Sequence, residues 1–292
     1  IRRDAAELNV GVAGSEIVGL VPLEAILQAA GYYMERENLF ILDERQKVRL
    51  VIDRLGLSSI QPFVPEEKII EYMVEGEQDG PLVRKTVRGF IDAVGARTST
   101  PGGGSVAALM GSLGAALGAM VGWLTYGRRR YEHLDGAMRE HLPPLVEIQE
   151  ELLRAVDADT DAFSDFMDAL RMPGDTDEQK AARKAAMQEG LKTATRVPLH
   201  TMELADRAWP SMLEIARVGQ YSSRSDVEVG AKALEACLYG AYRNVVINLA
   251  DIDDEDFCRE TESKAEALLG RGREKLAELQ EAVLARTGDV PA

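Results

Sequence analysis

The chain contains few of the residues that build metal centres or disulfide frameworks. Its 292 residues include two cysteines, Cys237 and Cys258, and three histidines, His133, His141 and His200. The cysteines form no CxxC pair, and none of these side chains has the spacing of a zinc site. We therefore expect no metal, no disulfide framework and a reducing compartment, with the cytoplasm as the simplest location.

Positive charge is also scarce. There are 34 Lys and Arg residues against 49 Asp and Glu, which gives a formal net charge of −15. This balance argues against nucleic acid or an anionic membrane as the main partner, but not against a small anionic ligand in a local basic pocket. The first residues show no signal-peptide pattern. A hydrophobic content of 46% allows a sizeable core in one or two domains.

The most informative segment carries no charged residue at all. It spans residues 99–127 and begins with Ser-Thr-Pro-Gly-Gly-Gly-Ser, residues 99–105, before a long apolar helix. Glycines at a helix N-terminus let backbone N–H groups approach an anionic ligand group closely. The alternative is a capping turn in which Thr98 to Thr100 or Ser105 caps the helix. The residues favour neither interpretation over the other.

The apolar helix has large side chains on one face and small ones on the other. The large face holds Val106, Leu109, Met110, Leu113, Leu117, Met120 and Leu124, and the small face holds Gly111, Gly114, Gly118, Gly122, Ala107 and Ala115. This pattern predicts a central bundle helix that is packed on both sides. A transmembrane span fits the length but not the charged helices around it. A helix that dimerises by its small face is the third interpretation.

The chain is predicted to have two regions of different character. Residues 1–74 mix a strand pattern at 10–21 with helices at about 22–34, 43–55 and 65–74. An acidic linker with glycine and proline follows at 75–81. From Leu82 onward only helical periodicity is found, at about 82–96, 104–126, 131–141, 143–171, 175–208 with an interruption at Pro198, 210–218, 224–250 and 254–286. We predict a mainly α protein with an all-helical bundle over 82–292.

One carboxylate interrupts an apolar stripe. In helix 143–171, Asp159 fills the gap between Val156 and Phe163. The opposite, solvent side is expected to carry Asp157, Asp161 and Asp165 as a plain charged face. Burial raises the pKa of a carboxyl group, which suits general acid–base chemistry near neutral pH. A structural ion pair or a hydrogen-bonded core aspartate is the alternative.

A polar edge follows the apolar stripe of helix 224–250. It contains Asp226, Gly230, Cys237, Asn244 and Asn248. Small and neutral polar groups in this position line a polar cavity or make hydrogen bonds between helices. For Asn248 we favour hydrogen bonding between helices.

Several of these motifs together resemble one protein family. The segments 97–109, 124–131, 156–163, 224–227 and 241–249 are similar to the cyclodeaminase domain of the formimidoyltransferase-cyclodeaminase family. Residues 1–74 resemble the end of the formimidoyltransferase half through segments 14–22 and 37–42. The resemblance implies a truncated α/β remnant before the bundle. The catalytic part of the transferase half, including its histidine, would lie upstream, so transferase activity is not expected.

The resemblance implies a folate enzyme without a permanently bound cofactor. A cyclodeaminase converts 5-formimidoyltetrahydrofolate to 5,10-methenyltetrahydrofolate and ammonia, as an ammonia-lyase in histidine degradation and one-carbon metabolism. The family's full-length protein is a bifunctional homo-oligomer, here expected to be at least a dimer, that takes polyglutamylated folate. A methenyltetrahydrofolate cyclohydrolase and a folate-binding or assembly module without turnover are the alternative functions.

The resemblance also implies site residues. The family's catalytic aspartate matches Asp159, which would be the general acid–base. Candidate folate-binding residues are Thr98, Pro101, Gly102, Gly103, Gly104, Ser105, Asp226, Asn244, Asn248 and Arg128. The run from Arg128 to Arg130 would meet the glutamate tail of the folate, or else form a solvated helix end.

Overall fold

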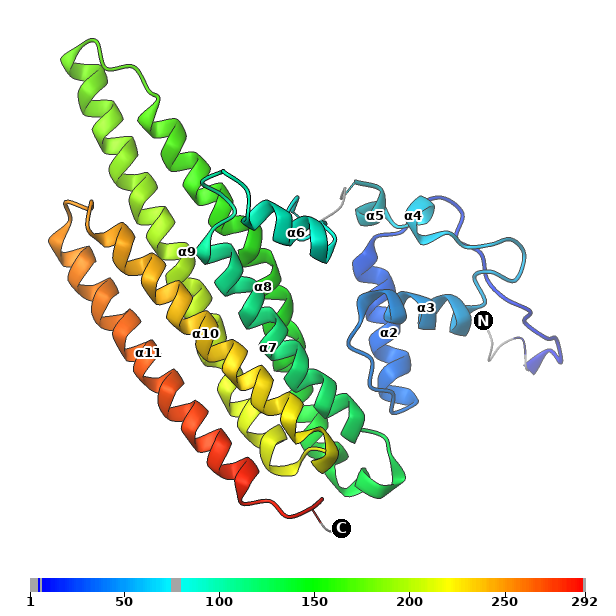
Figure 1. Ribbon diagram of the computed structural model, residues 1–292. Helices are drawn as coiled ribbons and strands as arrows, with labels where there is room; N and C mark the ends of the chain where they lie inside the picture. Colours follow the sequence, from blue (N-terminus) through cyan, green and yellow to red (C-terminus); the bar gives the residue numbers. More distant parts are fainter. Residues whose placement is uncertain (1–4, 6, 75–79, 291–292) are drawn as a thin grey trace. The chain divides into compact units, whose positions relative to one another are not determined.

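The computed structural model describes residues 5, 7–74 and 80–290. The chain divides into two compact units, residues 1–78 and 79–292, and each is described by itself. The predicted linker 75–81 lies outside the described residues except for Gly80 and Pro81. Helices make up most of the C-terminal unit and about half of the described part of the N-terminal unit (Figure 1).

The N-terminal unit is built around two amphipathic helices. Its helices include α2 (Leu23–Arg36), α3 (Glu44–Leu55), α4 (Pro65–Lys68) and α5 (Ile70–Val74). A small core joins α2, α3 and the residue between α4 and α5, and it consists of Ile26, Ala30, Val48, Val51 and Ile69. The unit therefore has its own apolar core, although a modest one.

The strand predicted over residues 10–21 is wrong. Most of this segment has no regular secondary structure, and its apolar side chains do not share one buried face: Val18 is 92% exposed, whereas Ile17 and Val21 pack against the small core. One isolated parallel bridge joins Val21 to Ile69. A strand needs a neighbouring strand to satisfy its backbone groups, and no strand forms among the residues that the structure describes. The α/β character expected for this region is therefore absent from its described part.

The C-terminal unit is an elongated helical bundle (Figure 1). Its helices are α6 (Val87–Val94), α7 (Gly103–Thr125), α8 (Asp135–Leu170), α9 (Asp177–Val218), α10 (Arg224–Leu249) and α11 (Glu255–Leu284), with short 3₁₀ helices at Arg129–Leu134 and Tyr221–Ser223. Helix α7 packs against α8, α9 and α10, whereas α11 covers α9 and α10 from outside. The predicted mainly α class is confirmed.

Two helices are longer than predicted because they continue through prolines. Helix α8 contains Pro143 and Pro144, and α9 contains Pro198 and Pro210. A proline inside a helix costs about 3 kcal/mol. Burial of one leucine or isoleucine side chain contributes about 1.5–3 kcal/mol. The flanking residues of α8 on its inner face are fully buried, namely Leu142, Leu145 and Ile148. Packing therefore outweighs the local preference for a break.

The small face of α7 is buried within the chain. A Cβ atom at Gly114 would lie 2.7 Å from the Gly230 carbonyl of α10, and one at Gly118 would collide with Met212 of α9. Glycine therefore allows the backbones of these helices to approach closely. The interpretation in which α7 dimerises by its small face is wrong, because that face packs against other helices of the same chain.

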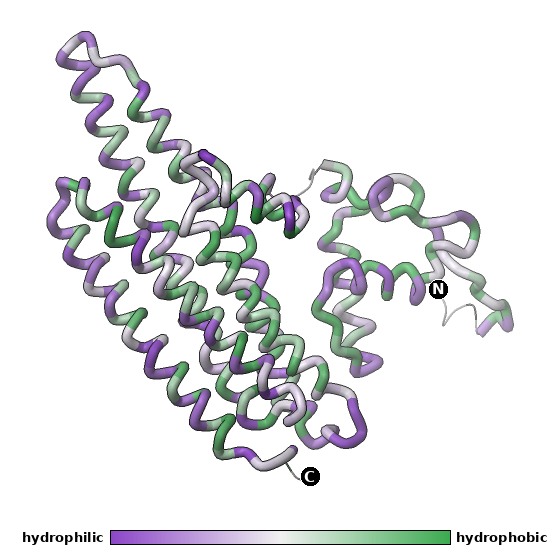
Figure 2. Tube along the Cα trace, in the orientation of Figure 1, coloured by the Kyte–Doolittle hydropathy of each residue, from purple (hydrophilic) through white to green (hydrophobic). Residues whose placement is uncertain are grey.

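The large face of α7 is partly exposed, contrary to the prediction of packing on both sides. Leu113 is 54% exposed, and Met120 and Trp123 also reach the surface. Figure 2 shows α7 as a run of hydrophobic and neutral residues, whereas the outer helix α11 alternates in character. By length and composition α7 could span a membrane, but 61% of its most apolar window is buried in the bundle. It is the central helix of the bundle, as predicted.

Candidate active site

Asp159 of α8 faces the first turn of α7. Its Oδ2 accepts hydrogen bonds from the backbone N–H of Ser105 at 2.9 Å and from the Ser105 hydroxyl at 3.2 Å. Ser105 is fully buried and Asp159 is half-buried. The prediction that Asp159 lies on the inner side of its helix is therefore confirmed.

The glycines before Ser105 allow this close approach. A Cβ atom at Gly104 would collide with the Asp159 carboxylate, so only glycine fits there. A Cβ atom at Gly103 would lie 3.5 Å from Nδ2 of Asn244. The backbone of the glycine run thus lies between a carboxylate on α8 and an amide on α10.

The capping turn that was the alternative for this loop does not form through a side chain. Gly102 is the N-cap residue of α7, and as a glycine it supplies no side chain. In a capped helix, the N-cap side chain would accept a hydrogen bond from the backbone N–H of Ser105. Here that N–H donates to Asp159 on another helix instead. Thr98 is exposed and Pro101 is buried. The loop is therefore joined to α8 by a tertiary contact and not by a local cap.

Burial raises the pKa of the Asp159 carboxyl group. The two hydrogen bonds from Ser105 act in the opposite direction, because they stabilise the carboxylate, but desolvation is the larger effect. The positive end of the α7 dipole also favours the anion. Asp159 can therefore take up and release a proton at a higher pH than an exposed aspartate.

The two asparagines of α10 have different surroundings. Nδ2 of Asn244 donates to the Gly240 carbonyl of its own helix at 2.8 Å and lies beside Gly103. Nδ2 of Asn248 donates to the Ala194 carbonyl of α9 at 2.8 Å. Asn248 thus joins two helices, as favoured from the sequence, and Asn244 is the asparagine at the glycine loop.

Arg128 and Asp226 lie at the opposite end of the bundle from Asp159. The 23 residues of α7 span about 34 Å, and Arg128 follows its C-terminus. Asp226 lies in the first turn of α10, which runs antiparallel to α7 because Gly230 faces Gly114 whereas Asn244 faces Gly103. A single chain therefore does not bring either residue to the glycine loop.

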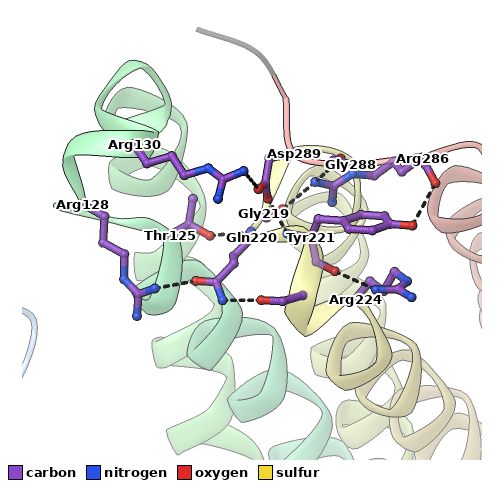
Figure 3. A network of polar contacts seen from close by, with 11 residues as sticks. Thr125, Arg128, Arg130, Gly219, Gln220, Tyr221, Arg224, Arg286, Gly288 and Asp289 are labelled. Atoms are coloured by element: carbon purple, nitrogen blue, oxygen red, sulfur yellow. Dashed lines mark hydrogen bonds and ion pairs between the residues drawn. The ribbon is translucent and has the colours of Figure 1, made fainter.

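A polar network holds this opposite end together (Figure 3). Nη1 of Arg128 donates to Oε1 of Gln220 at 2.8 Å, and Arg130 pairs with Asp289 at 2.6 Å. The backbone N–H of Tyr221 donates to the same aspartate at 2.8 Å. That hydrogen bond is the largest cause of the lowered pKa of Asp289. In the run from Arg128 to Arg130, Arg128 and Arg130 thus make structural contacts in this network.

Asp157 is a buried carboxylate that sequence reasoning placed in solvent. It is only 7% exposed, and it accepts hydrogen bonds from the backbone N–H groups of Leu82 at 2.8 Å and Val83 at 3.2 Å. A Cβ atom at Gly80 would collide with its carboxylate. The solvent-face prediction is wrong because the segment before α6 covers this side of α8. Helical periodicity does not predict that a distant segment of the chain will bury this face of α8.

An apolar cavity of about 510 Å³ lies between α6, α7 and α8. The residues that line it are Leu82, Val83, Lys85, Val87, Phe90, Ile91, Val94, Val106, Leu109, Leu113, Leu153 and Val156. Val106 directly follows Ser105, and Val156 precedes Asp159 by one helical turn. Neighbours of both Ser105 and Asp159 therefore line the cavity, although these two residues do not line it themselves.

The cysteines and histidines form no second centre. Among the residues that the structure describes, no group of three or more His, Cys, Asp or Glu side chains is arranged to hold a metal ion. Cys237 and Cys258 are free thiols. Burial raises the pKa of Cys237 to about 12, so this thiol stays protonated.

These features define a class of protein. It is a helical bundle in which the glycine-rich start of a central helix meets a half-buried aspartate suited to proton exchange. A family model described as formiminotransferase-cyclodeaminase matches residues 86–267, and one described as formiminotransferase domain matches residues 1–75. The chain belongs to the formimidoyltransferase-cyclodeaminase family.

Its relatives agree with this assignment. The chain is 47% identical over 277 residues to formimidoyltransferase-cyclodeaminase of Mus musculus and 48% identical over 281 residues to that of Dictyostelium discoideum. These alignments cover 94% and 96% of the chain but 51% of each relative, so the chain spans about half their length.

Two further similarities concern the bundle. Methenyltetrahydrofolate cyclohydrolase of Methylorubrum extorquens is 35% identical over 185 residues, which cover 63% of the chain and 89% of that protein. The crystal structure of formiminotetrahydrofolate cyclodeaminase from Thermotoga maritima has a TM-score of 0.62 at 24% identity, covering 69% of this chain and 96% of that one. This structural likeness supports the fold alone.

Proposed function

We propose that the bundle of residues 82–292 is a formimidoyltetrahydrofolate cyclodeaminase. It would convert 5-formimidoyltetrahydrofolate to 5,10-methenyltetrahydrofolate and ammonia, as an ammonia-lyase. The observation that carries the proposal is the half-buried Asp159 at the start of α7, with its raised pKa. High identity to relatives named for this activity supports it.

The reaction needs one proton moved between two nitrogen atoms. N10 of the folate attacks the carbon of the protonated formimidoyl group, which forms a tetrahedral intermediate. The Asp159 carboxylate then accepts the N10 proton and passes it to the amino group. The bond from carbon to that nitrogen breaks, ammonia leaves, and the methenyl bridge remains. Asp159 ends in its starting state, and general acid–base catalysis of this kind contributes about 10²–10⁴-fold in rate.

The glycine loop and Asn244 would surround the substrate near this carboxylate. Backbone N–H groups at the start of α7 and the Asn244 amide are suited to polar atoms of the pterin. The Ser105 hydrogen bonds orient the carboxylate, so that it is aligned before substrate binds. This mechanism requires no permanently bound cofactor, and the tetrahydrofolate derivative is the substrate.

One assay tests the proposal and separates its alternatives. The chain is mixed with 5-formimidoyltetrahydrofolate or with a formyl-folate, and the methenyl chromophore is followed. Turnover of the formimidoyl substrate supports the cyclodeaminase. A preference for interconversion with the formyl substrate would instead support a cyclohydrolase, the activity named for the Methylorubrum extorquens relative. No turnover with either would leave a binding module.

We further propose a cytoplasmic homo-oligomer that acts in histidine degradation. The exposed large face of α7, with Leu113, Met120 and Trp123, supports pairing of two copies. An antiparallel pairing of the two α7 helices would place Arg128 of one copy near the glycine loop of the other, where it could meet the glutamate tail of a folate. Sedimentation of the wild type and of Met120→Glu tests this, since Met120 is 37% exposed and does not line the cavity between α6, α7 and α8. A monomeric wild type would contradict it.

A further inference from the structure

Two carboxylates hold the two ends of one segment against α8. Asp157 accepts the N–H groups of Leu82 and Val83 at one end, and Asp159 accepts the N–H of Ser105 at the other. Two residues apart on a helix, these side chains point in directions about 160° apart. The segment 82–105 therefore wraps around one side of α8 between two fixed points.

The segment encloses space and does not collapse onto the bundle. None of the eight described residues of α6 is buried, although its apolar Phe90 and Ile91 point to the cavity below. The cavity volume of about 510 Å³ falls in the range of small-molecule sites, about 300–1,000 Å³. The cavity is open to solvent on one side, where Val87 is 80% and Ile91 is 62% exposed. A cavity of this size under an anchored segment is suited to a ligand.

The lining indicates the chemistry of that ligand. Lys85 is the one charged residue among the described residues that line the cavity, and the others are aliphatic apart from Phe90. An apolar cavity with one cation selects a flat apolar group that carries an anionic substituent. At its inner end the cavity reaches Val106 and Val156, next to Ser105 and Asp159.

We propose that this cavity binds an aromatic carboxylate, namely the p-aminobenzoylglutamate part of the folate substrate. The aromatic ring lies among the apolar side chains, and the carboxylate lies toward Lys85. The nitrogen that joins the ring to the pterin then lies at the inner end, toward Asp159. Asp157 is a positioning residue, because it holds the segment that forms the roof. The assignment to folate rests on the proposed function, whereas the cavity's preference for an aromatic carboxylate does not.

Binding of p-aminobenzoyl-L-glutamate tests the proposal directly, by calorimetry on the full chain. Ile91→Trp fills the cavity from α6, where the residue is 62% exposed, so folding should be preserved. Val229→Trp is the matched control, since Val229 is 59% exposed on α10 and does not line the cavity. We expect the wild type and the control to bind the probe and Ile91→Trp to bind it at least tenfold more weakly. Lys85→Met should weaken binding and reduce its salt dependence.

Steady-state kinetics separate this proposal from the proposed function. In Ile91→Trp the KM for formimidoyl-folate should rise at least tenfold while kcat changes less. Normal KM and normal probe binding in this variant, with an active wild type, would overturn the cavity assignment and leave the cyclodeaminase intact. Selective probe binding by a wild type that forms no methenyl product would contradict the cyclodeaminase alone. A changed sedimentation coefficient with unchanged probe binding would assign the cavity to an interface and overturn the proposal.

Discussion

The two ends of the bundle each hold an aspartate, and the pKa values of these two aspartates are shifted in opposite directions. At the start of α7, Asp159 is withdrawn from water and its pKa is raised, beside a cavity. At the end of α7, the Asp289 carboxylate pairs with Arg130 and accepts a hydrogen bond from the Tyr221 N–H, and its pKa is lowered. A group with a raised pKa in a cleft is a candidate for proton transfer, whereas a satisfied network serves stability. Changes at the first end should therefore affect turnover, and changes at the second should affect folding.

The largest effect is expected from Asp159→Asn. The amide keeps the size of the side chain but cannot accept and return a proton, so kcat should fall by about 10²–10⁴-fold. Helical content by circular dichroism should stay the same. Asp161→Asn is the matched control, because Asp161 is exposed on the same helix and should give wild-type turnover. Near-normal turnover of Asp159→Asn would remove the catalytic assignment.

Gly104→Ala should damage both activity and folding. Its Cβ atom would collide with the Asp159 carboxylate, so α7 and α8 must shift apart. Overpacking of this kind costs about 1–3 kcal/mol of unfolding free energy. The measurements are thermal unfolding and methenyl formation. Gly270→Ala on α11 is the control, because nothing lies within 4 Å of its added Cβ atom, and equal effects of the two variants would argue against the tight contact.

Asp289→Asn tests the opposite end of the bundle. It removes the ion pair with Arg130 and weakens the acceptor for the Tyr221 N–H, which should lower the unfolding free energy by about 1–2 kcal/mol. Turnover at saturating substrate should not change. A large loss of kcat at preserved stability would contradict the structural role.

The same aspartate predicts a pH dependence of stability. Because the folded pKa of Asp289 lies below its unfolded value, its contribution is present above the unfolded pKa and is lost as pH falls through the folded pKa. Unfolding of the wild type and of Asp289→Asn at a series of acidic pH values measures this. The difference between them should shrink as the pH is lowered, and a constant difference would contradict the assignment.

The smallest effect is expected from Ser105→Ala. Loss of the hydroxyl that donates to Asp159 removes a stabilising contact of the carboxylate, so the pKa of Asp159 should rise further. The acid limb of the kcat/KM profile should therefore move to higher pH, since a higher pH is then needed to ionise Asp159. Ser164→Ala, an exposed change on α8, should leave the profile in place. A shift to lower pH would contradict the hydrogen-bond assignment.

The sequence predicted the position of Asp159 correctly but not the positions of Arg128 and Asp157. The position of Asp159 followed from helical periodicity, because Val156 and Phe163 lie on the same face of α8. The separation of Arg128 from Asp159 did not follow, because similarity to a family motif does not show how far apart two residues lie in the folded chain. Asp157 was placed in solvent because its cover comes from Leu82 and Val83, which are 75 and 74 residues away in the chain.

Local patterns were enough to predict that the chain from α7 onward is helical, that α7 is the central helix, and that Asp159 points inward, since each of these depends on residues within a few helical turns. Long-range packing alone established which face of α7 turns inward, why the helices continue through Pro143 and Pro198, and why residues 10–21 form no strand. The physical reason is the same in each case. Burial against distant segments contributes as much free energy as a local preference costs, and local periodicity does not identify those segments.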